Sequence, residues 1–157
     1  MILESLILQT KLFLQEDMGL TIVNVDTTAL NSEALSLNQH TSMIGVGGKL
    51  NLMTVISFDD ELISKLVELF MDGDEVAEDE LEDVMESVTG EVINTIIGLA
   101  IPTFPNRGKG VTITPPITIN DASSLKKHKN SNIVSANITT NFGSLSISAI
   151  GEADSIR

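Results

Sequence analysis

The chain has 157 residues and a formal net charge of −13, and 42% of its residues are hydrophobic. This length and hydrophobic content fit one folded domain with a core, and they exclude a disordered acidic tail. Nine basic residues against 22 acidic ones argue against a nucleic-acid-binding protein, because binding to phosphates depends on Lys and Arg.

The composition also limits the chemistry and the location of the protein. The absence of cysteine excludes disulfides, thiolate metal ligands and a thiol nucleophile. The first ten residues lack the positive charge of a secretory signal, and no apolar run approaches the length of a membrane span. We therefore expect a soluble cytoplasmic domain whose partner is neither nucleic acid nor lipid.

The N-terminal half begins with a helix-like pattern and continues with strand-like runs. Apolar residues at helical spacing predict a helix over residues 2–17, ended by Gly19. Three short β-rich runs then predict strands, at 21–25, 42–47 and 49–58. Residues 59–73 open with two acidic residues and close at a glycine, which is the pattern of an amphipathic helix.

The C-terminal half begins with the longest predicted helix and ends in strands. Residues 74–100 give an acidic lead into an apolar helix that stops before Pro102. The later sequence alternates apolar residues with Ser, Thr and Asn, as antiparallel strands with one solvated face do. These strands are expected at 111–119, 132–140 and 143–151, and a polar turn with three lysines is expected at 121–130.

This order of elements predicts an α+β fold in a single domain spanning residues 1–157. We expect a mostly antiparallel sheet packed against long helices. The helix-then-strands pattern occurs twice, which indicates two related halves. No segment has the composition of a linker, so no domain boundary is expected.

Two features that could suggest metal binding have simpler interpretations. The acidic run 72–83 has Val76 and Ala77 where a calcium loop needs an oxygen ligand and a glycine, so we expect a solvated helix start. His40 and His128 are isolated from other ligand-type residues in the sequence, which favours surface roles over a metal site.

The long helix carries one polar stripe on an otherwise apolar surface. At 100° per residue, a narrow arc contains Glu80, Asp83, Ser87, Glu91, Asn94 and Gly98. The remaining surface is apolar from Val84 onward, so we expect the helix to be buried on most sides. The stripe must then face something other than the core, because burying an unpaired carboxylate is costly. Gly90 and Gly98 at this stripe either admit another backbone or pack tightly on the sheet, and the sequence leaves both interpretations open.

Glu91 and Asn94 are one turn apart within this stripe. Their side chains emerge together, about 5–6 Å apart at Cβ. A carboxylate anchors a positive charge, and an amide donates and accepts hydrogen bonds at once. The pair is therefore suited to hold a cation with one group and to orient a water molecule with the other, although such a short motif also arises by chance.

The residues of this helix resemble the CheC/CheX/FliY phosphatases of bacterial chemotaxis, and their CheX-like members in particular. Residues 44–73 resemble the strand–strand–helix stretch of the family, and residues 81–100 (LEDVMESVTGEVINTIIGLA) resemble its active helix. The family pattern is Asp or Ser, then Glu four residues on, then Asn three further, then a downstream Pro. The matching residues are Ser87, Glu91, Asn94 and either Pro115 or Pro116. The chain has one Glu-x-x-Asn, as CheX-like members do, so the N-terminal helix resembles the silent half of a duplicated unit.

The resemblance implies an enzyme that hydrolyses the aspartyl phosphate of a CheY-like response-regulator receiver. On this analogy, Glu91 pairs with a lysine of the receiver and Asn94 orients the attacking water, while the partner-binding residues are Ser87, Gly90 and Gly98. The Mg²⁺ belongs to the receiver, so no cofactor or metal of the chain's own is expected. The resemblance also implies a homodimer joined at sheet edges, for which the strands after residue 111 are suitable.

A non-catalytic domain of the same fold is the alternative. Such a domain would be a receiver-binding adaptor or a relative of flagellar-switch components. The intact Glu91/Asn94 pair favours the phosphatase, because an adaptor has no need of an amide at that spacing.

Overall fold

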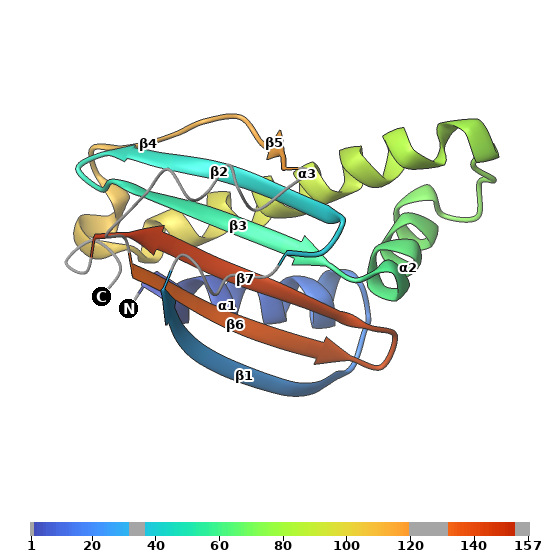
Figure 1. The fold of residues 1–157 in the computed structure, drawn as a ribbon, viewed down its shortest axis with the longest axis horizontal. Helices are drawn as coiled ribbons and strands as arrows, with labels where there is room; N and C mark the ends of the chain where they lie inside the picture. The colour runs from blue at the N-terminus through green and yellow to red at the C-terminus, as the bar shows by residue number, and fades with distance from the viewer. Residues whose placement is uncertain (1, 32–36, 120–131, 153–157) are drawn as a thin grey trace.

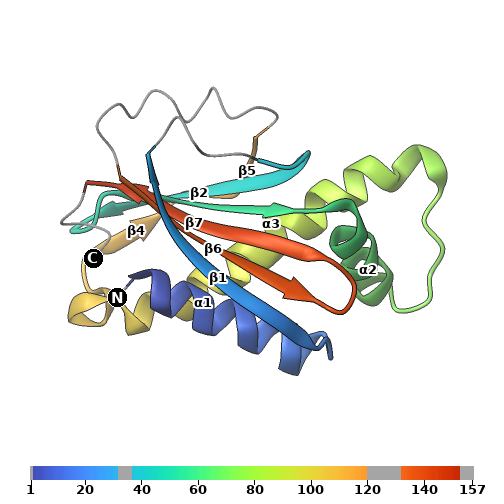
Figure 2. The ribbon, with the colours of Figure 1, turned by 60° about the horizontal axis from the view of Figure 1, so that its bottom comes forward.

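The structure is a computed structural model that describes residues 2–31, 37–119 and 132–152 (Figure 1). Three α-helices lie on one face of a seven-stranded antiparallel sheet (Figure 2). The helices are α1 (Ile2–Leu12), α2 (Asp60–Met71) and α3 (Leu81–Ala100). The strands are β1 (Ile22–Asn31), β2 (His40–Gly48), β3 (Leu52–Phe58), β4 (Val111–Ile113), β5 (Ile117–Thr118), β6 (Asn132–Thr140) and β7 (Ser144–Gly151). This is the α+β architecture that the sequence predicts.

The sheet is built from two similar halves that meet at its centre. Its strand order is β1-β6-β7-β3-β2-β4, and the short β5 also pairs with β2. The β2–β3 hairpin of the first half and the β6–β7 hairpin of the second lie side by side through the β3–β7 pair. α1 contacts β6 and β7, and α3 contacts β2 and β3, so each helix covers the hairpin of the other half. This arrangement confirms the repeated helix-then-strands pattern.

The central strands are buried on both faces of the sheet. Toward the helices, residues such as Ile56 and Phe58 join the main core. On the opposite face, a second cluster contains Val55, Ile119, Ile133 and Ile150. The expectation that the C-terminal strands keep one solvated face is therefore wrong for much of β6 and β7, because this second cluster covers part of that face.

Strand lengths depart from the sequence prediction at the two sheet edges. β1 continues to Asn31, well beyond the predicted 21–25, because it pairs with β6 along its length. The predicted strand 111–119 is divided into β4 and β5, since Pro115 and Pro116 have no backbone N–H to donate to a ladder. The predicted lysine-containing turn at 121–130 lies outside the described residues.

A single carboxylate connects the start of α2 to the second hairpin. Asp59 Oδ1 accepts a hydrogen bond from the Leu62 backbone N–H at 2.8 Å, which caps the helix. Asp59 Oδ2 accepts another from the Ser144 N–H, also at 2.8 Å. α2 ends at Asp72 in the left-handed conformation, followed by Gly73, as the sequence predicts for this helix end.

The expectation that no apolar segment approaches the length of a membrane span has one exception, in the α3 region. By length and hydropathy alone, Glu78–Thr103 is long enough to cross a membrane, a property that buried core helices share. In the structure its apolar side chains pack in the main core, among them Val92, Ile93, Ile96 and Ile97.

Candidate functional site

The polar stripe of α3 is exposed, and the opposite side of the helix is buried. α3 packs against β2, β3, α1 and α2, and these contacts explain why most of the surface of the helix itself is apolar. Its buried residues are Met85, Val88, Thr89, Val92, Ile93, Ile96, Ile97 and Ala100. All six stripe residues are exposed, as the sequence predicts. Leu99 departs from the prediction of an apolar buried surface, because it is 51% exposed.

Glu91 and Asn94 lie in a hollow of about 620 Å³ between α3 and the edge of the sheet. The hollow is lined by Ser42, Asp83, Glu86, Ser87, Gly90, Glu91, Asn94, Pro116 and Thr118. The stripe residues Ser87 and Asp83 therefore share one concave surface with the Glu91/Asn94 pair, whereas Gly98 lies outside it. Only Gly98 among the sequence-predicted site residues is separate from the hollow.

The segment between β4 and β5 closes the far wall of this hollow. Thr114 lies between the two short strands and is bound to β2: its N–H donates to the Gly45 carbonyl at 2.9 Å, and its Oγ1 accepts from the Gly45 N–H at 2.8 Å. The Ser42 hydroxyl donates to the Ile117 carbonyl at 3.3 Å. These bonds hold Pro116 beside α3. Of the two candidate prolines, Pro116 lines the hollow and Pro115 does not.

The two glycines of the stripe have different surroundings. A Cβ built on Gly90 would lie 3.4 Å from the Pro116 Cβ, at van der Waals distance from the β4–β5 segment. A Cβ built on Gly98 would have no neighbour within 4 Å. Gly90 therefore packs beside Pro116, whereas no packing within the described residues accounts for Gly98.

The functional groups of Glu91 and Asn94 are available to another molecule. Both side chains are exposed, and no hydrogen bond or ion pair links either of them to the described part of the chain. A free carboxylate can accept hydrogen bonds from a cationic partner, and a free amide can donate and accept at once. The pair can therefore bind a positively charged group of another molecule and orient a water molecule.

The hollow is negatively charged. Asp83, Glu86 and Glu91 line it, and none of the described residues that line it is Lys or Arg. Among the described residues, no group of His, Asp or Glu has an arrangement that could hold a metal ion. The geometry therefore favours attraction of a basic protein surface over a resident metal.

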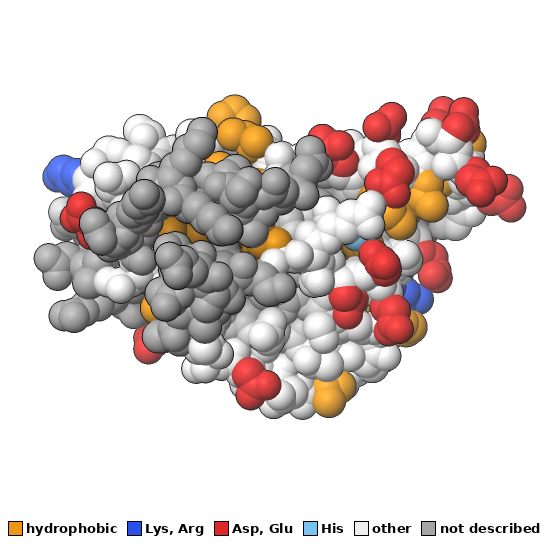
Figure 3. All heavy atoms as spheres, in the orientation of Figure 1, with side chains coloured by type: hydrophobic (Ala, Val, Ile, Leu, Met, Phe, Trp, Pro, Cys, Tyr) orange, Lys and Arg blue, Asp and Glu red, His pale blue; other side chains and the backbone are white. Residues whose placement is uncertain are grey.

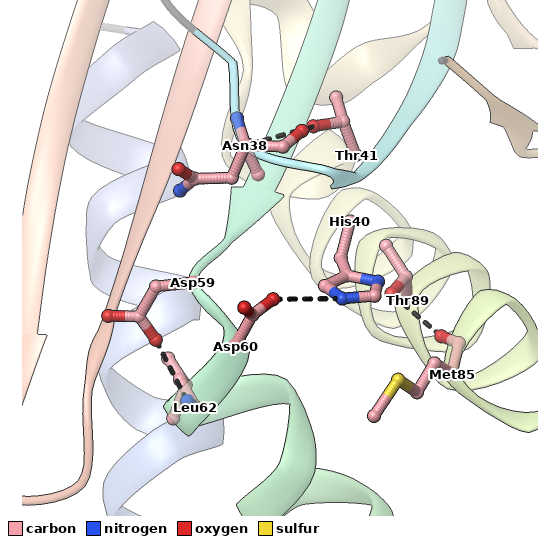
Figure 4. Close-up of polar contacts among 9 residues, drawn as sticks. Asn38, His40, Thr41, Asp59, Asp60, Leu62, Met85 and Thr89 are labelled. Carbon is pink, nitrogen blue, oxygen red and sulfur yellow. Dashed lines mark hydrogen bonds and ion pairs between the residues drawn. The ribbon is translucent and has the colours of Figure 1, made fainter. Parts of the chain in front are cut away.

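Polar contacts occur within α3 and between β2 and the start of α2 (Figure 4). The Thr89 hydroxyl donates to the Met85 carbonyl at 2.8 Å within α3. His40 Nε2 lies 3.1 Å from Asp60 Oδ1, and only 10% of the His40 side chain is exposed. The expected surface role of His40 is therefore wrong. The β2–β3 register places His40 opposite Phe58, and this brings Asp60 within reach. His128 lies outside the described residues.

Three of the residues around the hollow escaped the sequence reasoning. Ser42 and Thr118 come from β2 and β5, and strand pairing alone brings them to α3. Glu86 lies on α3 but falls outside the narrow arc of the stripe. Glu86 lies next to Asp83 around the helix axis, and this position was the one signal that could have added it to the candidate site residues.

Comparisons with known proteins identify the family and the fold of the chain. The sequence model of a family described as chemotaxis phosphatase CheX matches residues 40–141, more than half of the chain. No curated protein matches the sequence significantly.

Several solved structures share the fold. CheX from Desulfovibrio desulfuricans is 16% identical over 96% of this chain and 99% of that chain, with a TM-score of 0.75. The CheX–CheY–BeF3–Mg²⁺ complex from Borrelia burgdorferi matches with 17% identity over 96% of this chain and 97% of that chain, with a TM-score of 0.72. FliY from Thermotoga maritima is 19% identical over 94% of this chain and 84% of that chain, with a TM-score of 0.60. At these identities, the structural likeness shows the fold.

Proposed function

The chain belongs to the CheX family of chemotaxis phosphatases, and from this premise we propose that it hydrolyses the aspartyl phosphate of a CheY-like response-regulator receiver. The observation that carries the proposal is the Glu91/Asn94 pair, exposed together in one hollow on a helix whose opposite side is buried, with no partner for either side chain among the described residues. The family supplies the class of activity, and the pair supplies the residues to which we assign it.

In the proposed reaction, a water oxygen attacks the phosphorus of the receiver's phosphoaspartate. The bond between phosphorus and the aspartyl oxygen breaks, which releases inorganic phosphate and leaves the carboxylate on the receiver. Asn94 orients the water through its amide, whose oxygen accepts a hydrogen bond from the water while its N–H can donate to a phosphoryl oxygen. A neutral amide suits this position, because a carboxylate beside the phosphoryl group would repel it.

Glu91 is proposed to fix the register of docking. Its carboxylate would pair with a lysine of the receiver, and this contact places Asn94 at the phosphorus. The catalysis is positioning and electrostatic stabilisation, which carry most of phosphoryl transfer in general. We assign the Mg²⁺ of the reaction to the receiver; the Borrelia burgdorferi complex of CheX with CheY and BeF3 also contains Mg²⁺.

The remaining assigned residues are proposed to contact the receiver around this pair. Ser87 lines the same hollow one turn before Glu91. Gly98 lies one turn after Asn94 and has open space above it, so a partner backbone can approach closely there. Gly90 lies beside Pro116, and both line the hollow. Gly90 is therefore also proposed to contribute to the shape of the surface that the receiver contacts.

The test is an assay of phosphate release from CheY-like receivers of the same organism, phosphorylated with a small-molecule phosphodonor. Wild-type protein should shorten the phosphoryl lifetime of at least one receiver. Asn94→Ala should still bind that receiver but barely accelerate hydrolysis. If the wild type leaves every phosphoryl lifetime unchanged while binding a receiver, the adaptor of the same fold replaces the phosphatase.

We also propose a cytoplasmic homodimer joined at a sheet edge. Of the strands after residue 111, only β4 and β5 lie at an edge of the sheet, because β6 and β7 are internal. Ile113 and Ile117 on these strands are 40% and 51% exposed. Light scattering coupled to size-exclusion chromatography should report twice the monomer mass, and Ile113→Lys should reduce it.

A further inference from the structure

A second hollow of about 590 Å³ lies between the end of α2 and the first turns of α3, and we name it the α2–α3 groove. It is lined by Phe70, Met71, Glu80, Asp83, Val84, Ser87, Val88 and Glu91. Neither the family pattern nor the proposed chemistry uses its apolar residues.

The floor of the α2–α3 groove is apolar, and its side chains pack against residues of the protein interior. Phe70 is 36% exposed, and its ring packs at a tilt on Phe13 with 6.4 Å between the centroids. Val84 and Met71 are half-buried, and both also pack against the main core. These side chains therefore form a preformed apolar recess, which favours the insertion of an apolar side chain from a partner.

The surroundings of this recess are acidic. Between Lys65 and Arg107 the sequence has no basic residue and half of the chain's 22 acidic ones, namely Glu68, Asp72, Asp74, Glu75, Glu78, Asp79, Glu80, Glu82, Asp83, Glu86 and Glu91. Figure 3 shows acidic side chains gathered over this end of the molecule. Charge complementarity therefore selects an occupant whose apolar side chain is flanked by Lys or Arg.

The α2–α3 groove is continuous with the hollow that holds Glu91 and Asn94. Asp83, Ser87 and Glu91 line both. At 1.5 Å per residue, Val84 lies about 10 Å from Glu91 along the helix axis. A single protein surface docked over Glu91 therefore also covers the recess, because interfaces of ordinary size are considerably wider than this.

We propose that the α2–α3 groove is a specificity site for the receiver. It binds an apolar side chain flanked by Lys or Arg on the same phosphorylated receiver that Glu91 and Asn94 engage. This proposal rests on the proposed function for the identity of its occupant. Because the recess is remote from the phosphorus, it contributes to docking and to the choice of receiver, while the chemical step depends on Asn94.

The experiment separates docking from chemistry with two variants of the groove. Val84→Ser removes part of the apolar floor, and its control is Val23→Ser on β1, where the valine is 65% exposed at the other edge of the sheet. Glu80→Lys reverses a charge of the rim. Its control is Glu78→Lys, an exposed residue of the same acidic turn that does not line the groove.

For each variant, the rate of receiver dephosphorylation is measured against receiver concentration. Each groove variant should raise the half-saturating receiver concentration about 5- to 10-fold, as removal of a central interface contact does, and should leave kcat within twofold. The effect of Glu80→Lys should shrink as salt is raised, whereas that of Val84→Ser should persist. Each control should change the half-saturating concentration less than twofold.

A binding titration against the receiver activated with beryllofluoride and Mg²⁺ gives a readout that needs no hydrolysis. If the groove variants weaken this binding while the wild type does not accelerate hydrolysis, the groove is supported and the proposed phosphatase activity fails. If receiver binding is unchanged in both groove variants but weakened in Glu91→Gln, the proposal of a specificity site in the groove is wrong, whereas the proposed phosphatase activity is unaffected. A changed oligomeric state with unchanged receiver binding would also overturn it, because the occupant would then be a second copy of this chain. Val84→Ala replaces Val84→Ser if thermal melting shows that the serine variant is unfolded.

Discussion

Asn94→Ala is the perturbation that bears most directly on the proposed mechanism. The asparagine side chain is exposed and has no hydrogen-bond partner in the described part of the chain, so its removal leaves no buried group unsatisfied. Surface substitutions of this kind change the free energy of unfolding by about 0.5 kcal/mol or less. Alanine is also the better helix former by up to about 0.7 kcal/mol. We therefore expect a folded variant whose melting temperature equals or slightly exceeds that of the wild type.

The expected loss is in the chemical step. Removing one preorganised hydrogen-bonding group from an active site lowers kcat by about 10²- to 10³-fold, or roughly 2.7–4 kcal/mol of transition-state stabilisation. Since the amide is the only catalytic group that we assign to this chain besides the docking carboxylate, we expect about a 100-fold loss. The half-saturating receiver concentration should change less than threefold, because Asn94 is assigned to the water rather than to the receiver.

The assay is phosphate release at saturating and subsaturating receiver, with binding to the beryllofluoride-activated receiver measured separately. Asn94→Asp is the informative second variant, because it keeps the shape of the side chain but replaces the amide with a carboxylate that cannot donate a hydrogen bond. It should lose at least as much activity as Asn94→Ala. The control is Asn137→Ala, an exposed amide on β6 on the sheet face opposite the helices, which should retain wild-type kcat.

Two results would refute this reasoning. A kcat that falls less than fivefold in Asn94→Ala would mean that the water is positioned by another group. Loss of receiver binding in Asn94→Ala, with kcat at saturation preserved, would move the asparagine from the chemistry to docking.

Three further predictions follow from single contacts. Glu91→Gln should raise the half-saturating receiver concentration about 10-fold or more, with a smaller change in kcat. The reason is that a hydrogen bond to a charged group contributes about 1.5–3 kcal/mol. An unchanged half-saturating concentration in the same titration would contradict the docking role. Gly98→Ala should raise the free energy of unfolding by about 1 kcal/mol and the melting temperature by about 2–4 °C, because its Cβ would meet no atom within 4 Å. Weaker receiver binding by this more stable variant would support a close approach at Gly98, and unchanged binding would remove Gly98 from the interface. Asp59→Ala should lower the free energy of unfolding by about 2–3 kcal/mol in urea denaturation, because it removes the Leu62 cap and the Ser144 bond. Asp59→Asn should lose at least half of that, because its amide oxygen can accept one of the two bonds and its amide nitrogen cannot accept the other. A loss below about 0.5 kcal/mol in Asp59→Ala would contradict the role of this link.

Local patterns predicted the helices better than the edge strands. α2 and α3 lie within the predicted ranges, because capping residues and apolar periodicity act within a few residues of chain. The length of β1 could not be predicted in this way, since a polar edge strand is held by its pairing with β6 more than 100 residues later. The prolines explain the break between β4 and β5, but only the bonds of Thr114 to Gly45 show how that segment is held against β2.

The environment of individual side chains likewise depended on neighbours that are distant in sequence. His40 gave no sign of a partner, and it contacts Asp60 because the hairpin register brings the two together. Gly90 was open to two interpretations until Pro116 was found beside it. The α2–α3 groove had no sequence signature, because its floor combines Phe70 of α2 with Val84 of α3, and each residue alone fits an ordinary core position.

The sequence by itself determined the α+β class, the internal repeat and the placing of Glu91 and Asn94 on one exposed stripe, because helical phase and apolar patterning are properties of neighbouring residues. Only the tertiary structure decided which surfaces surround that stripe. Strand pairing brings Ser42, Pro116 and Thr118 to one side of it, and the packing of α2 places Phe70 on the other. The physical reason is that a concave surface needs walls from different elements, and the distances between elements are fixed by the core that they share.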